Sequence, residues 1–172
     1  MTVSTITLRT AGPPDLDTLK PLIESAYRGE SARAGWSHEA ELLTGERIRR
    51  SDLAAMLANP RQRILIADGE DSAIGCVSVS APAADGEAAY ISMLAVAPGL
   101  QAGGLGRQLL TAAETCAREV FGAQVAEMTV ISQREPLIAY YQRRGYVLGD
   151  ERRPFPDPAI THLDMVVLTR AI

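Results

Sequence analysis

Residues 91–110, near the middle of the chain, constrain the fold more than any other stretch. Residues 91–96 (ISMLAV) are apolar and partly β-branched, which predicts a short buried strand, and the proline and glycine that follow end it. From Leu105 onward apolar residues recur every three or four positions, which predicts one face of a helix that ends at Gly122. The stretch therefore predicts a strand, a loop and a helix in direct succession.

The loop between this strand and this helix, QAGGLG at residues 101–106, is rich in glycine. Glycines there let the backbone approach a ligand closely, and the first amide N–H groups of a helix have no helical partner. These N–H groups point outward at the positive end of the helix dipole. The loop therefore predicts an anion site, most naturally for a phosphate, although a tight turn that needs a positive φ would have the same composition.

The same glycines partly match the dinucleotide-binding pattern G-x-G-x-x-G. Gly104 and Gly106 fit its first two positions, but Leu109 occupies the third. Glu127 lies near the distance expected for a ribose-binding acid. However, that pattern places its first glycine directly after the strand of an early βαβ unit, whereas here about seven residues intervene. The chain after Glu127 is also too short for the other strands of a doubly wound sheet, so this fold is disfavoured.

Two motifs give the sequence a family resemblance. The pattern Gln101-x-x-Gly104-x-Gly106, which follows the Leu-Ala-Val run of residues 94–96, resembles the acetyl-coenzyme A loop of the GNAT superfamily of N-acetyltransferases. The segment YQRRGY at residues 141–146 is similar to the family's Y-x-x-x-G-F/Y motif at the end of its fourth helix. Both motifs lie on the expected elements and in the expected order. The residue-specific part of the resemblance covers residues 91–146.

The chain is expected to form one α+β domain over residues 1–172. Its length, with 47% hydrophobic and 22% charged residues, suits a single globular domain. An antiparallel meander is expected before the glycine loop, and the crossover through the following helix makes the next strand parallel to the last. The resemblance implies the same arrangement, a GNAT-like fold whose mostly antiparallel central sheet has about seven strands and is flanked by helices.

Hydrophobic periodicity, turn residues and capping residues define the expected elements. Strands are expected at residues 3–8, 64–67, 74–80, 88–96, 125–131, 146–148 and 162–169. A first helix is expected to start within residues 11–17 and to run to residue 27, and further helices are expected at residues 37–43, 51–58, 105–120 and 136–144. Pro21 falls inside the first helix, which predicts a kink or a later start. Ser37 and Ser51 are expected to cap the second and third helices.

An acetyl-coenzyme A donor needs a site for its pyrophosphate and for its peptide-like pantetheine arm. The backbone amides at the start of the helix can hold the pyrophosphate. The resemblance implies that the strand before the loop splays from its neighbour, so that backbone groups of this strand pair with the pantetheine. The expected cofactor-binding residues are Leu94, Val96, Gln101, Ala102, Gly103, Gly104, Leu105, Gly106 and Arg107.

The resemblance implies an enzyme that transfers an acetyl group from acetyl-coenzyme A directly to a primary amine of a small molecule, an amino acid or a peptide. Tyr141 matches the tyrosine of the family motif and is the expected general acid for the departing thiolate, because a phenol with a pKa of about 10 stays protonated at neutral pH. Without the resemblance, the expected role of Tyr141 is structural, as a helix residue that packs under the sheet. A non-catalytic sensor of acyl-coenzyme A is the alternative function.

The sequence leaves the general base open. The inward-facing side chains expected on the two central strands are not acids: Tyr90, Ser92 and Thr129. The available carboxylates, each also typical of a solvated surface, are Glu39, Glu41, Glu87 and Glu127. A water relay through Tyr90 and Ser92 is compatible with the sequence. The chain departs from the family pattern at Arg134, where many relatives have an asparagine.

The acceptor site is expected in the early helices and their loops. The expected substrate-binding residues are Tyr27, Arg28, Trp36 and Glu39. Glu39 and Glu41 would suit a cationic acceptor and Arg28 a carboxylate, which together fit an amino acid, a polyamine or an aminoglycoside-like amine. Trp36 is the only tryptophan, and it forms either a pocket wall or an anchor between its loop and the core.

Composition disfavours several other classes of protein. A net charge of -4 and a pI near 5.2 lack the basic footprint of nucleic-acid or anionic-membrane binding. The first residues do not resemble a signal peptide and no 18-residue apolar span occurs, so a cytoplasmic protein without a membrane partner is expected.

Cys76 and Cys116 are expected to be buried and reduced, which disfavours a ping-pong mechanism. His38 and His162 have no third ligand, so no metal is expected. The oligomeric state stays open, with a homodimer as one option.

Overall fold

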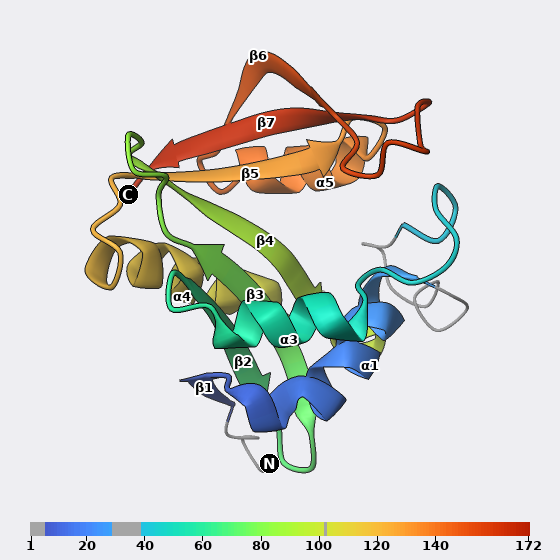
Figure 1. Ribbon diagram of the computed structural model, residues 1–172, viewed down its shortest axis with the longest axis vertical. Coiled ribbons are helices and arrows are strands. Elements are labelled where there is room, and N and C mark those ends of the chain that lie inside the picture. The colour runs from blue at the N-terminus through green and yellow to red at the C-terminus, as the bar shows by residue number, and fades with distance from the viewer. Residues whose placement is uncertain (1–5, 29–38, 102) are drawn as a thin grey trace.

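The structure is a computed structural model that describes residues 6–28, 39–101 and 103–172 (Figure 1). Seven strands form one sheet in the order β1-β2-β3-β4-β5-β7-β6. All neighbouring strands are antiparallel except β4 and β5, which are parallel. The strands are β1 (Thr7–Thr10), β2 (Gln62–Asp68), β3 (Ala73–Ser80), β4 (Ala88–Val96), β5 (Val125–Ile131), β6 (Val147–Pro154) and β7 (Asp164–Ala171). The mixed sheet and its parallel crossover confirm the predicted fold class.

Helices cover both faces of this sheet. The described α-helices are α1 (Leu16–Tyr27), α3 (Arg50–Ala58), α4 (Leu105–Glu119) and α5 (Glu135–Gln142). Short 3-10 turns precede α1 and α4, namely η1 (Pro13–Asp15) and η2 (Pro98–Leu100). Figure 1 shows α1 and α3 in front of β2, β3 and β4, with α4 behind these strands and α5 behind β5. None of the described helices is long and apolar enough to cross a membrane.

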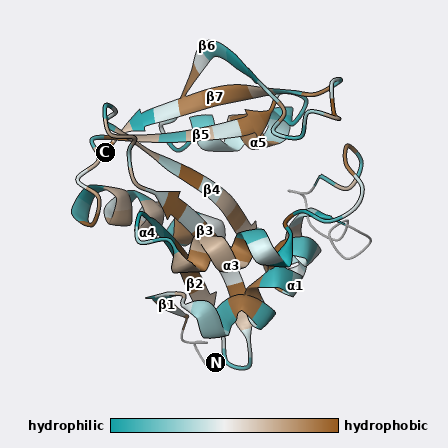
Figure 2. Ribbon diagram, viewed as in Figure 1, coloured by the Kyte–Doolittle hydropathy of each residue, from teal (hydrophilic) through white to brown (hydrophobic). Residues whose placement is uncertain are grey.

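The sheet therefore has a hydrophobic core on each face, and Figure 2 shows the apolar residues gathered along the central strands. Leu109 of α4 is fully buried against one face, and Ile23 of α1 is fully buried against the other. Helix α4 approaches β3 so closely that a Cβ atom on Gly75 would lie 2.8 Å from Cδ1 of Leu109 and 3.0 Å from the carbonyl oxygen of Ala95. Only a glycine fits at that position, which fixes α4 and the loop before it against the sheet.

The parallel strands β4 and β5 stay together for only part of their length. They pair over three positions, from Ala88 opposite Val125 to Tyr90 opposite Glu127. Beyond Tyr90 they diverge, and a gap opens between the end of β4 and β5 (Figure 1). The predicted splay of the strand before the glycine loop is present. It leaves the last residues of β4 with a free edge, which is the kind of edge that an extended ligand can join.

A β-bulge in β4 coincides with this gap. Cys76 of β3 pairs with Ala95 and Ser78 pairs with Ser92, so β4 has one residue more than β3 between these pairs. Met93 has a φ of 51°, a left-handed value that is uncommon for a residue with a side chain. The extra residue reverses which face each later side chain joins. Met93 and Ala95 pack with α1, whereas Leu94 packs against the core under α4.

The first helix differs from its prediction at Pro21. Helix α1 is continuous through this proline from Leu16 to Tyr27, so a later start is wrong. A proline removes the hydrogen bond to the carbonyl four residues earlier, here that of Asp17. Pro21 and Asp17 are both exposed, and water can therefore satisfy the freed carbonyl.

The other boundary errors lie at chain segments with little burial. The predicted cap Ser37 lies outside the described residues, and residues 39–45 contain a single hydrogen-bonded turn at Glu39 instead of a helix. Helix α3 begins at Arg50 with Arg49 as its N-cap residue, so Ser51 lies inside it. Strand β6 extends to Pro154, well beyond residue 148, because an exposed edge strand does not need alternating apolar residues. Strand β1 is found at Thr7–Thr10, later than predicted.

Candidate functional site

A groove lies where the free edge of β4 meets α4 and α5. Its volume is about 160 Å³. It is lined by Ala26, Tyr27, Leu94, Ala95, Val96, Gln101, Gly104, Gly106, Leu137, Tyr140, Tyr141 and Arg144. The structure thus brings together most of the residues predicted to contact a coenzyme A donor, together with the motif tyrosine.

The N-terminus of α4 opens onto this groove. Its N-cap residue Gly104 has a φ of 85°, and the first helical hydrogen bond runs from the N–H of Gln108 to the carbonyl of Gly104, at 3.2 Å. The N–H groups of Leu105, Gly106 and Arg107 therefore come before the helical ladder. These donors stand at the positive end of the helix dipole, where an anion is stabilised.

The predicted loop residues take different parts in this site. The Leu105 side chain is buried in the core under α4, so only its backbone can face a ligand. Arg107 and Gly103 are exposed and do not line the groove, and Ala102 lies outside the described residues. A Cβ atom on Gly106 would lie 3.2 Å from the Tyr140 hydroxyl, so a larger residue here would be tight against that side chain.

The free edge of β4 presents backbone groups to the groove. The N–H of Ala97 donates to the carbonyl of Ile74 at 2.9 Å, so the alternate residue Val96 directs its own N–H and C=O away from β3. Two side chains donate hydrogen bonds to backbone carbonyl oxygens of this edge. Gln101 donates to the carbonyl oxygen of Val96 at 3.1 Å, and the Tyr27 hydroxyl donates to that of Leu94.

Tyr141 stands at the inner end of the groove. Its side chain is buried and packs edge-on against Tyr140 and Tyr146, with ring centroids 5.4 Å and 5.9 Å apart. Burial raises the pKa of Tyr141 above its ordinary value, so the phenol stays protonated. The Tyr141 hydroxyl makes no hydrogen bond to any residue that the structure describes. Among the described residues it is therefore a neutral donor without an acceptor.

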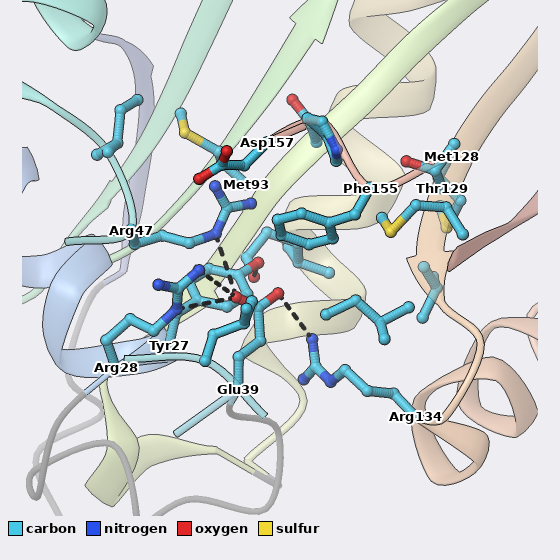
Figure 3. A pocket seen from close by; sticks show the side chains of 18 of the residues that line it. Tyr27, Arg28, Glu39, Arg47, Met93, Met128, Thr129, Arg134, Phe155 and Asp157 are labelled. Carbon is cyan, nitrogen blue, oxygen red and sulfur yellow. Dashed lines mark hydrogen bonds and ion pairs between the residues drawn. The ribbon is translucent and has the colours of Figure 1, made fainter. Parts of the chain in front are cut away.

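A larger cavity of about 740 Å³ lies across the gap between β4 and β5 (Figure 3). Its walls come from α1, the segment before α3, β4, β5 and the loop after β6. Four residues line both this cavity and the groove: Tyr27, Leu94, Leu137 and Tyr141. The two spaces therefore meet at these side chains, at the point where β4 leaves β5.

Glu39 lies in the wall of the large cavity among three arginines (Figure 3). Its Oε2 atom is 3.1 Å from Nε and 3.0 Å from Nη2 of Arg28, and its Oε1 atom is 3.4 Å from Nη1 of Arg134. Arg47 comes within 3.6 Å of Oε2 through its Nε atom. Arg28 and Glu39 thus line the cavity as predicted, but they pair with each other. Trp36, the fourth predicted acceptor residue, lies outside the described residues.

The candidates for a general base occupy different surroundings. Tyr90, Ser92 and Thr129 line the large cavity, and the hydroxyls of Tyr90 and Thr129 are 2.6 Å apart. Glu127 is bound by Arg153 at 2.8 Å and does not line the cavity. The remaining two carboxylates, Glu41 and Glu87, are exposed and also lie outside the cavity wall. The candidates that line the cavity are therefore three hydroxyl side chains and the carboxylate of Glu39, which is paired with arginines.

Neither cysteine has the surroundings of a nucleophile. Cys76 and Cys116 are both buried and reduced, and neither lines the groove or the large cavity. Burial raises the pKa of Cys76 to about 12 and also raises that of Cys116. The described residues hold no group of three side chains suited to binding a metal ion.

Sequence reasoning missed two arginines that face these spaces. The guanidinium group of Arg144 lies 3.6 Å above the Tyr140 ring and lines the groove, and its buried Nε atom has no hydrogen-bond partner among the described residues. Its spacing of four residues from Tyr140, at the end of the predicted helix 136–144, was a usable signal, although Arg144 lies in the turn that follows α5. Arg47 had no such signal, because its position depends on how the segment before α3 folds back onto α1.

Fold and site together are those of an acetyltransferase. The model of the acetyltransferase (GNAT) family matches residues 23–146, which is more than half of the chain. The chain therefore belongs to the acetyltransferase (GNAT) family, and the family predicted from its two motifs is confirmed. Among curated proteins, no sequence matches this chain.

Solved structures share the fold along nearly the whole chain. The paiA N-acetyltransferase of Thermoplasma acidophilum, in complex with coenzyme A, has a TM-score of 0.75 at 17% identity, over 98% of this chain and 99% of that chain. The yncA protein of Salmonella typhimurium, with its cofactor acetyl-CoA, has a TM-score of 0.70 at 19% identity, over 96% and 93%. A ribosomal-protein-alanine N-acetyltransferase of Brucella melitensis has a TM-score of 0.71 at 20% identity, over 96% and 99%. At such identities the similarity establishes the fold.

Proposed function

We propose that this protein transfers an acetyl group from acetyl-coenzyme A directly to a primary amine of a small molecule, an amino acid or a peptide. One observation carries the proposal: the groove and the large cavity meet at a buried tyrosine, Tyr141, whose hydroxyl has no hydrogen-bond partner in the described part of the chain. A donor in the groove and an acceptor in the cavity would approach each other there. Such positioning supplies much of the acceleration in a two-substrate transfer.

The groove suits each part of the donor. The pyrophosphate fits the free N–H groups at the start of α4. The amide groups of the pantetheine arm fit the edge of β4 around Leu94 and Val96, in the way that an added strand pairs with a sheet. Arg144 can contact a phosphate from the opposite wall, because its Nε atom lacks a partner among the described residues. Two similar structures contain coenzyme A or acetyl-CoA, which supports this donor.

The reaction requires one bond to form and one to break at the thioester carbon. The neutral amine attacks this carbon, the C–N bond forms, and the C–S bond of the tetrahedral intermediate breaks. Tyr141 donates its phenolic proton to the departing sulfur, and the proton released by the amine restores the phenol. Water held by the hydroxyls of Tyr90, Ser92 and Thr129 can carry that proton, since these side chains line the acceptor side.

Release of free coenzyme A thiol over a panel of primary amines tests this proposal. We expect thiol release that depends on the amine and an equal amount of N-acetylated product. Calorimetry with acetyl-coenzyme A, without any amine, measures donor binding separately. Donor binding with no thiol release on any amine would contradict the transferase function and favour a non-catalytic sensor of acyl-coenzyme A.

A further inference from the structure

Among the described residues, arginines outnumber carboxylates in the buried part of the large cavity. Three guanidinium groups, those of Arg28, Arg47 and Arg134, surround the single carboxylate of Glu39 (Figure 3). The side chains of Arg28, Arg134 and Glu39 are only 9–10% exposed. Charges this far from water are weakly screened. A cationic acceptor would be repelled here, whereas an anionic group would be attracted.

The other charged residues of the cavity lie at its rim. Arg49, Glu46, Asp52 and Asp157 are all exposed. Glu46 pairs with Lys20 at 3.0 Å, and the Oδ1 atom of Asp157 accepts a hydrogen bond from the N–H of Ala159 at 2.9 Å. Neither Asp52 nor Asp157 forms an ion pair with any of the three arginines in the described part of the chain. Water screens these rim charges, so they do not cancel the charge of the buried cluster.

Arg47 is the arginine that remains open to a ligand. Arg28 already directs Nε and Nη2 to Glu39 and Nη1 to the carbonyl of Glu46 at 3.3 Å. In contrast, the Nε atom of Arg47 is buried and has no hydrogen-bond partner among the described residues, since its 3.6 Å approach to Glu39 is too long. The structure also gives its two Nη atoms no hydrogen-bond partner among these residues.

Arg47 is nevertheless held firmly in place. Its backbone N–H donates to both carboxylate oxygens of Glu24, at 2.8 Å and 3.0 Å. Its guanidinium group lies 5.0 Å from the centre of the Tyr27 ring. The main chain of Arg47 is thus held by Glu24, and its side chain, whose guanidinium group lies over an aromatic ring, is partly exposed to the cavity at 28%. A guanidinium so placed and without a hydrogen-bond partner among the described residues suits a carboxylate, because its planar fork matches the two carboxylate oxygens.

We propose that the acceptor carries a carboxylate besides its primary amine and that Arg47 binds this carboxylate, an assignment that rests on the proposed transferase function. The position of Tyr27 limits the size of the acceptor. Its ring contacts Arg47, and its hydroxyl contacts the carbonyl of Leu94, which borders the donor groove. One tyrosine side chain therefore separates the carboxylate site from the donor edge. We therefore expect a small acceptor such as an α-amino acid, with its amine directed toward Tyr141.

Matched pairs of acceptors test this proposal most simply. α-Amino acids and their amides differ only in the carboxylate, and both keep the primary amine. We expect the acid of a preferred pair to have a kcat/KM at least about tenfold above that of its amide. This is the effect of losing one hydrogen bond to a charged group. Calorimetry on the protein loaded with coenzyme A should show the same preference in binding. Equal values for acids and amides, or a stronger preference for O-phosphoethanolamine than for any amino acid, would overturn the proposal.

Two variants assign the preference to Arg47. Arg47→Gln should lower the kcat/KM for the acid at least about tenfold and bring the acid-to-amide ratio toward one, with the KM for acetyl-coenzyme A unchanged. Arg47→Lys keeps the charge but loses the fork, so an intermediate ratio is expected. Arg50→Gln is the matched control, because Arg50 is 59% exposed and pairs with Asp17 outside the cavity. A ratio unchanged in Arg47→Gln would overturn the assignment.

The two proposals fail in different ways. Acid-selective binding without turnover on any amine would contradict the transferase function and leave the carboxylate site supported. Turnover on amines without a preference for the acid would support the transferase and overturn the carboxylate site. Absence of any binding by amino acids to the loaded protein would also overturn it.

Discussion

The hydroxyl of Tyr27 donates a hydrogen bond to the carbonyl oxygen of Leu94 and thereby joins the end of α1 to the bulged part of β4. The same tyrosine ring lies beside Arg47 in the large cavity. Because Tyr27 and Leu94 line both spaces, this contact forms part of the boundary between the groove and the large cavity. Burial raises the pKa of Tyr27 to about 12, so the hydroxyl donor persists at neutral pH.

Removal of the Tyr27 hydroxyl should weaken the contact between α1 and β4, while the ring still fills its place between the two spaces. Tyr27→Phe keeps the ring but loses the bond to Leu94, and we expect the free energy of unfolding to fall by about 1 kcal/mol. The KM for acetyl-coenzyme A should rise, because the edge of β4 is less well fixed. Urea unfolding and steady-state kinetics measure the two effects. A variant with unchanged stability and unchanged KM would show that the contact has no such role.

Two glycines, one just before α4 and one just after it, allow the effect of backbone strain to be separated from the effect of ligand contact. Gly104 (φ 85°) and Gly122 (φ 65°) both have left-handed backbones, and an added Cβ atom would meet no atom within 4 Å at either position. Alanine at each should therefore cost about 1 kcal/mol of stability. Only Gly104→Ala should weaken coenzyme A binding, since Gly104 lines the groove. Equal coenzyme A affinities in the two variants, measured by calorimetry, would argue against phosphate binding at this helix start.

Arg144 is expected to contribute to donor binding. Arg144→Gln removes a guanidinium that lines the groove, and we expect coenzyme A to bind about tenfold more weakly, as for one charged hydrogen bond. Arg143→Gln is its control, because Arg143 is the adjacent arginine, is exposed and does not line the groove. Titration with coenzyme A at two salt concentrations measures the affinity of both variants. The same loss of affinity in the two variants would indicate a general charge effect instead of a contact.

Stability should fall at alkaline pH because buried groups hold their protons. The Cys76 thiol, whose pKa burial raises to about 12, stays protonated in the native state, whereas the unfolded thiol loses its proton near its ordinary pKa of about 8.5. The native state thus binds more protons above that pH. The free energy of unfolding should decrease by about 1.4 kcal/mol per pH unit from this group, up to about pH 12. Urea unfolding across this range should show a shallower slope in Cys76→Ala, and an identical slope would refute this origin.

The strongest sequence patterns predicted the elements that form the groove. Strands β4 and β5 have the predicted bounds, because apolar, β-branched runs with clear turn residues lie on the buried centre of the sheet. The two motifs likewise predicted the family and the glycine at the start of α4. The catalytic role of Tyr141 stays a prediction. The bulge at Met93 was not predicted, since nothing in an apolar strand marks where one residue is left unpaired.

The large cavity was predicted less well because its interactions are between distant segments. Glu39 and Arg28 both line it, and their role in acceptor binding stays a prediction. The pairing of Glu39 with Arg134 joins residues 95 positions apart in the sequence. A local pattern of charges cannot reveal which partner neutralises a carboxylate. The same holds for Arg47, whose orientation depends on the contact of its backbone with Glu24.

The turnover of Tyr141→Phe tests the central claim most directly, with Tyr146→Phe as its control. Tyr146 packs against Tyr141 and donates to Glu114 at 2.8 Å, but it lines neither cavity, so its loss should lower stability and leave kcat unchanged. For Tyr141→Phe we expect kcat to fall at least about a hundredfold, as for loss of a general acid, with the KM for acetyl-coenzyme A within about twofold of the original. A kcat equal to that of the unaltered protein would contradict the account.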